Sequence, residues 1–153
     1  MLAELIDAAW GSPMTDRKLS WIRVAGLGIV FIWFGVGGTM HFVSPEFFVR
    51  IVPPWVPWPW AAVYISGVFE LAGAAGLLHK RTRWLAGIGL FWLTIAVTPA
   101  NVHMWLHPEL FPEISPILLG VRLVIQVALL ACIWWSTQPP VVREAETSAP
   151  KDN

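Results

Sequence analysis

Residues 58–78 are WPWAAVYISGVFELAGAAGLL, an apolar run with a single acidic residue, Glu70, and no basic residue. A helix needs roughly 20 such residues to cross a hydrocarbon core about 30 Å thick. Three further stretches meet the same requirement, namely Leu19–Phe42, Arg83–Leu106 and Ile114–Ser136. The sequence therefore predicts an all-α fold, a bundle of four transmembrane helices.

The composition also favours a membrane environment. Of the 153 residues, 56% are hydrophobic and 13% are charged, whereas soluble domains carry about 25% charged residues. The 10 basic and 10 acidic residues cancel, so we expect the lipid bilayer as a partner and no nucleic acid. A single cysteine, Cys132, excludes an internal disulfide bond and a thiolate zinc site within this chain.

Lysine and arginine residues gather on one side of the predicted bundle. They precede the first span, fill the turn at residues 80–83 and follow the fourth span, whereas the other two loops contain only Arg50. The positive-inside rule then places both termini in the cytoplasm. We divide the chain into an N-terminal amphipathic segment at 1–18, a membrane domain at 19–136 and a disordered cytoplasmic tail at 137–153.

The loop after the first span, SPEFFVRIVPPWVPWP at residues 44–59, contains five prolines. Proline removes a backbone donor and clashes with the preceding helical turn, so the second half of the loop cannot be a regular helix. Its Phe, Ile, Val and Trp side chains are too apolar for free solvation. We expect this loop to cap the bundle at the outer interface.

Two charged residues lie inside the predicted spans, where an unpaired ionisable group costs several kcal/mol. Glu70 is near the middle of the second span, and Arg122 is roughly 12 Å deep in the fourth at 1.5 Å per residue. Because both spans run from outside to inside, we expect an ion pair between them. Gln126 lies one turn beyond Arg122, and Thr98 and Asn101 share one face of the third span.

Two features add to this polar cluster. Pro99 should free the backbone carbonyl of Ile95, with Arg122 or Asn101 as its donor. The first span ends in GVGGTMH, so His41 lies near the outer surface, where we expect it to meet water rather than bind a metal. The cluster predicts either a ligand site or a structural network between helices. The ligand-binding residues of the first interpretation, which includes no catalytic and no metal-binding residue, are Glu70, Arg122, Gln126, Asn101, Thr98 and His41.

Four segments, in this order along all four spans, are HFVSPEFFVRIVPPWVP (41–57), SGVFELAGAAGLL (66–78), TPANVHM (98–104) and RLVIQ (122–126). Together they resemble the DoxX family of small bacterial membrane proteins. The resemblance implies a four-helix, multi-pass protein of the bacterial cytoplasmic (inner) membrane, in a family named for a subunit of a thiosulfate-to-quinone oxidoreductase. The polar positions that it carries over to this chain are Glu70, Asn101, Arg122 and Gln126.

Three functions follow as hypotheses. The expected one is an accessory membrane subunit of a quinone-linked or other redox complex, with a quinone in the outer pocket and a redox partner protein that supplies the electron carrier. No flavin, haem, iron–sulfur or nicotinamide motif is visible, so we expect no intrinsic cofactor and no enzyme activity from the isolated chain. The alternatives are a small-molecule or proton-coupled transporter, for which a homodimer supplies the missing walls, and a structural or assembly protein.

Overall fold

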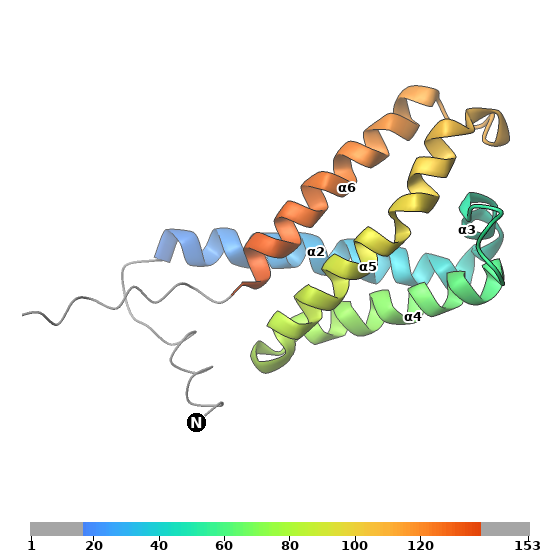
Figure 1. Cartoon of the computed structure of the whole chain (residues 1–153). Helices are drawn as coiled ribbons and strands as arrows, with labels where there is room; N and C mark the ends of the chain where they lie inside the picture. Colours follow the sequence, from blue (N-terminus) through green and yellow to red (C-terminus); the bar gives the residue numbers. More distant parts are fainter. Residues whose placement is uncertain (1–16, 139–153) are drawn as a thin grey trace, which may run out of the picture.

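The computed structural model describes residues 17–138, with side chains from residue 21 onward (Figure 1). The helices of this part are α2 (Arg17–Val43), α3 (Pro45–Ile51), α4 (Pro59–Leu78), α5 (Lys80–Leu106) and α6 (Pro116–Thr137), with a 3-10 turn, η1 (Pro108–Leu110), between the last two. No strand occurs within the described range. The predicted amphipathic segment lies outside it except for residues 17–18, and the predicted tail except for residues 137–138.

Helices α2, α4, α5 and α6 are long and apolar enough to cross a membrane. The chain is therefore a multi-pass membrane protein with four spans in its described part, as predicted. Large apolar side chains point away from the bundle on several helices, and Ile32, Val68 and Val124 are 62%, 55% and 69% exposed. In a bilayer these side chains contact lipid tails, which are as apolar as they are.

Helix α5 begins at Lys80, earlier than the predicted start at Arg83. The turn between α4 and α5 is made by His79, whose Nδ1 accepts a hydrogen bond from the backbone N–H of Arg81 at 3.3 Å. The carbonyl oxygen of His79 accepts a second hydrogen bond from the backbone N–H of Thr82 at 3.1 Å. Because these contacts satisfy the free donors of a helix start, the basic residues form the first turn of α5 rather than a loop.

The long helices pack α2 against α4, α4 against α5, α5 against α6, and α6 back against α2 (Figure 1). Glycine allows α2 and α4 to approach closely, because a Cβ atom placed on Gly67 would lie 2.7 Å from the Cβ atom of His41 and 3.3 Å from the carbonyl oxygen of Gly38. Small residues at a crossing point are a common means of helix association in membranes. The buried core of the bundle consists of Val30, Phe34, Ala74, Leu77, Leu90, Leu129 and Ile133.

One end of the bundle, here called the loop end, carries α3 and η1. Arg50 of α3 donates a hydrogen bond to the carbonyl oxygen of Leu110 at 2.7 Å and forms an ion pair with Glu113 at 3.0 Å. Its guanidinium carbon also lies 5.1 Å from the centre of the Phe111 ring, which is fully buried beside Ile51. The first loop is thereby fixed to the loop between α5 and α6, and the two loops cover the loop end together.

The proline-rich half of the first loop, residues 52–58, contains no helix, as predicted. Trp58, between Pro57 and Pro59, has a left-handed backbone conformation with φ 51° and ψ 63°. A following proline disfavours the right-handed helical conformation of the residue before it. Helix α4 therefore starts at Pro59, whose fixed φ suits a first helical position.

The close crossing of α2 and α4 predicts the outcome of enlarging Gly67. We expect Gly67→Ala to lower the free energy of unfolding by about 1–3 kcal/mol, because the added methyl group forces two packed helices apart. The matched control is Gly35→Ala, where an added Cβ atom meets nothing within 4 Å. Thermal unfolding in a mild detergent, followed by tryptophan fluorescence, measures both. Equal melting temperatures for the two variants would contradict the close packing.

Candidate functional site

A cavity of about 450 Å³ lies at the loop end, lined by residues of the four long helices, of α3 and of the segment that follows α3. This volume is within the range of small-molecule binding sites, about 300–1,000 Å³. Thr98 is not part of the lining and reaches the cavity wall through a hydrogen bond with Gln126. The predicted residues that do line the cavity are His41, Glu70, Asn101, Arg122 and Gln126.

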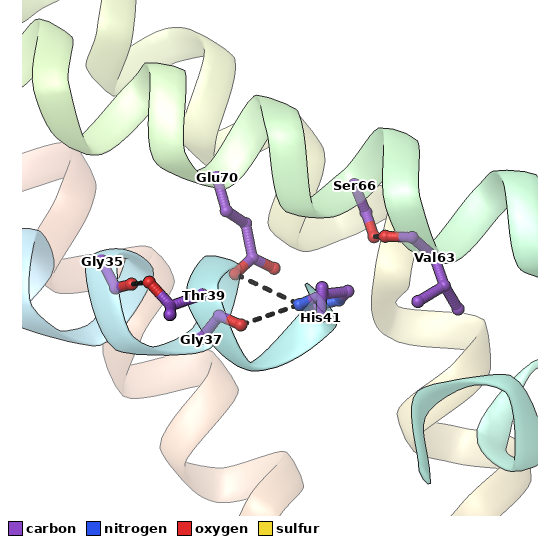
Figure 2. A network of polar contacts seen from close by, with 7 residues as sticks. All are labelled: Gly35, Gly37, Thr39, His41, Val63, Ser66 and Glu70. Carbon is purple, nitrogen blue, oxygen red and sulfur yellow. Dashed lines mark hydrogen bonds and ion pairs between the residues drawn. The ribbon is translucent and has the colours of Figure 1, made fainter. Parts of the chain in front are cut away.

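The wall formed by α2 and α4 contains His41 and Glu70 (Figure 2). Nδ1 of His41 lies 2.8 Å from the carbonyl oxygen of Gly37, and because a carbonyl oxygen only accepts, Nδ1 is the donor. The same nitrogen is 3.9 Å from Oε2 of Glu70, which is too far for a hydrogen bond. The contact between the two side chains is therefore electrostatic, and no hydrogen bond to the Glu70 carboxyl group is present among the described residues.

His41 is buried, with 7% of its surface exposed, so the prediction that it meets water at the interface is wrong. Its ring stacks on Phe48 of α3 with 3.9 Å between the ring centres. His41 lies near the end of α2, where its side chain would be exposed without α3. Helix α3 therefore covers it. The loop was expected to cap the bundle, but no periodic pattern specifies its path or shows which of its side chains reaches His41.

The Glu70 carboxyl group lies directly against the backbone of α2. A Cβ atom placed on Gly37 would be 2.8 Å from Oε2 of Glu70, so a side chain at this position would displace the carboxyl group. One turn earlier on α4, Ser66 also lines the cavity, and its hydroxyl group donates to the carbonyl oxygen of Val63 at 2.9 Å. Figure 2 shows Glu70 pointing from α4 towards the α2 segment that carries Gly37 and His41.

The opposite wall, formed by α5 and α6, is a chain of hydrogen bonds. Arg122 donates from Nη2 to Oδ1 of Asn101 at 3.0 Å, and Nδ2 of Asn101 donates to Oε1 of Gln126 at 2.8 Å. Nε2 of Gln126 donates to the carbonyl oxygen of Thr94 at 2.9 Å and to the hydroxyl oxygen of Thr98. Every amide in the chain has both a donor and an acceptor role, which fixes the orientation of the Arg122 guanidinium group at the cavity.

The side chain that donates a hydrogen bond to the α5 backbone near Pro99 is not one of the two that we predicted. Neither Arg122 nor Asn101 bonds to the carbonyl oxygen of Ile95, and the side-chain amide of Gln126 bonds instead to that of Thr94, one residue earlier. The position of the proline identified the right turn of α5. The choice of carbonyl group depends on which side of α5 faces α6, and the proline alone does not determine it.

The predicted ion pair between Glu70 and Arg122 is wrong. Arg122 bonds to a neutral amide, that of Asn101, and the Glu70 carboxyl group instead lies 3.9 Å from Nδ1 of His41. Both charged residues line the same cavity, one on the α4 wall and one on the α6 wall. Helical spacing gives their depth in the membrane but not the width of the space between the helices, so the sequence could not distinguish a contact from a separation.

Most of the residues that line the cavity were not part of the predicted site, and three of them, Phe48, Trp55 and Ser66, show why. Phe48 and Trp55 enter the cavity from α3 and the segment after it, and Ser66 enters from α4. Ser66 lies four residues before Glu70, and this spacing places both on one helix face, so a signal for it was present. The two aromatic residues depend on the path of the loop and had no such signal.

The two walls offer complementary chemistry. Arg122 carries only donors, whereas the Glu70 carboxyl group accepts at both oxygens when ionised and also donates when protonated. Aromatic side chains of Trp33, Phe34 and Phe48 form apolar surface around them. The cavity therefore suits a small molecule with an oxygen acceptor at one end, a donor at the other and an apolar, flat centre.

A family model described as Domain of unknown function (DUF8561) matches residues 27–137. This match overturns the resemblance to the DoxX family, whose four segments are short and rich in residues common to membrane helices. The redox complex, its partner protein and the bacterial inner membrane lose the support that this resemblance gave them. No curated protein and no solved structure matches the chain.

The hydrogen-bond chain on α5 and α6 predicts the effect of removing its centre. We expect Gln126→Leu to lower the free energy of unfolding by about 1–2 kcal/mol, the range for polar contacts between membrane helices, because the Asn101 side chain loses its acceptor. Val127→Leu, at a position that is 67% exposed, serves as the control. Chemical denaturation in detergent gives both values. A Gln126→Leu protein as stable as the control would rule out a structural role for this chain of hydrogen bonds.

The separation of Glu70 and Arg122 predicts that their substitutions act independently. We expect the stability changes of Glu70→Gln and Arg122→Met to add in the double variant within about 0.5 kcal/mol, as for residues without a shared contact. A direct ion pair would instead make the double variant more stable than the sum, because each single change leaves one charge without its partner. A double-variant cycle on the purified protein distinguishes the two results.

Proposed function

The chain belongs to the DUF8561 family, whose description assigns no function, and we propose that it is a membrane protein that binds a small molecule in the loop-end cavity. One observation carries the proposal: a carboxyl group and a guanidinium group face the same cavity, and neither has a hydrogen-bond partner of opposite charge in the described part. Charged side chains inside a membrane are costly, and they usually mark a binding site or a transport path. A bound molecule supplies the missing partners.

The arrangement of the polar groups supports one class of ligand. A quinone or quinol head group has oxygen atoms at opposite edges of a flat ring. In the quinol, one oxygen accepts from Arg122 and the opposite hydroxyl group donates to Glu70, whereas the quinone offers acceptors alone, one of them to Arg122. The ring itself matches the aromatic surface of Phe34, Phe48 and Trp33. The quinone expected from the sequence is thus proposed again on the chemistry of the cavity, without a redox step.

The distribution of basic residues supports an orientation for the site. Lys80, Arg81 and Arg83 lie at the α4–α5 turn, which is the end of the bundle opposite the loop end. By the positive-inside rule this turn and both termini are cytoplasmic. The cavity then lies in the half of the membrane that is farther from the cytoplasm, below the cover formed by the two loops.

Binding of a tailless probe, 2,3-dimethoxy-5-methyl-1,4-benzoquinone, tests the proposal. Quinones quench tryptophan fluorescence, and Trp33 and Trp55 line the cavity, so titration of the detergent-purified protein reports occupancy. We expect Arg122→Met to weaken binding at least about tenfold, because a hydrogen bond to a charged group contributes about 1.5–3 kcal/mol.

The control is Val124→Met, on the same helix but exposed and outside the cavity lining, which should bind as the wild type does. Extraction and mass spectrometry of molecules that co-purify with the two variants give a second readout without an added probe. Saturable quenching that is the same in both variants, together with equal amounts of any co-purifying molecule, would place binding elsewhere and refute the proposal.

A further inference from the structure

A second hollow lies between α4 and α5, on the side of α5 that leads towards the α4–α5 turn. It is an open groove of about 710 Å³, lined almost entirely by apolar and small residues. Phe69 and Trp92 border it and are 60% and 63% exposed on the surface of the bundle. The groove therefore opens towards the membrane lipids and not into the core.

The groove has few polar groups in its lining. Thr82 carries the single hydroxyl group within the described residues, and it donates to the carbonyl oxygen of Gly76 at 2.8 Å. The indole N–H of Trp92 is the other polar side-chain group of the lining. What it can hold is an apolar chain, which packs by dispersion contacts alone.

The groove adjoins the loop-end cavity. Ala96 of α5 lines both hollows, and on α4 the groove residue Phe69 is the chain neighbour of the cavity residue Glu70. The two hollows thus follow one another along the α4–α5 interface. All the charged residues that line either hollow lie in the cavity, and the apolar groove lies beside it on the side of the α4–α5 turn.

We propose that the ligand of the cavity is a membrane lipid with one long aliphatic or isoprenoid tail, whose head group occupies the cavity and whose tail lies in the α4–α5 groove. This inference rests on the proposed function and specifies its ligand class. The polarity of the two hollows matches the two parts of such a molecule, and Ala96 marks the point where head and tail join. The lateral opening of the groove gives the tail its place beside the lipids.

Gly89 provides the test, because it lines the groove and an added Cβ atom there meets nothing within 4 Å. Because the backbone leaves room for a Cβ atom there, we expect a leucine side chain at this position to project into the groove. Gly28 is the matched control, since an added Cβ atom also meets nothing there and the residue lines neither hollow. The probes are the tailless benzoquinone and the same ring with a ten-carbon tail, both followed by fluorescence quenching.

We expect Gly89→Leu to weaken binding of the tailed probe at least about fivefold relative to Gly28→Leu, and to leave binding of the tailless probe unchanged. Comparing two variants in the same detergent cancels the partition of the tailed probe into micelles. If the ratio of the two affinities is the same in both variants, the tail does not lie in the groove, and the inference falls while the proposed function stands. If the wild type binds neither probe, both fall.

Should Gly89→Leu fail to fold, as shown by its melting temperature, Ala72→Leu tests the same groove from α4, because Ala72 is exposed and lines the groove but not the cavity. The expected result is again a selective loss of the tailed probe relative to Gly28→Leu. An equal affinity of Ala72→Leu and Gly28→Leu for the tailed probe would overturn the inference.

Discussion

A polar group inside a membrane must find its partner within the protein, and this constraint governs the structure at the loop end. Arg122 meets it through Asn101, and Gln126 links that amide to the backbone and side chains of α5. The result is a wall in which each group orients the next. Glu70 meets the constraint only in part, through a distant contact with His41, and the cavity lies where the polar contacts within the chain are incomplete.

The backbone geometry of α2 and α4 makes this cavity specific. Glycines at the crossing bring the two helices together, and Gly37 leaves space for the carboxyl group of Glu70 against the backbone of α2. The helix α3 then covers His41 with the ring of Phe48. Helix packing therefore sets the position of the wall formed by α2 and α4, and the loop that contains α3 separates this wall from water.

The four spans were predictable because a bilayer imposes length and apolarity on each helix, and the polar residues of the cavity stood out against that background. Their partners were less predictable. Spacing along one helix could not show that Glu70 faces His41 rather than Arg122, since this depends on the distance between helices. Phe48 and Trp55 lie in a segment without periodicity, and four short motifs led to the wrong family.

The ion pair between Arg50 of α3 and Glu113 differs from the rest of the site in its exposure to solvent. Both side chains are about half exposed, at 48% and 50% of their surface. The backbone N–H of Glu113, and then Arg50, hold the pKa of the Glu113 carboxyl group below its usual value, so mild acidification leaves the ion pair in place. Dissolved salt acts on it more directly, since exposed charges are screened over about 8 Å at physiological ionic strength. One of the contacts that hold the cover of a site inside the bilayer thus has a strength that depends on the salinity of the surrounding water.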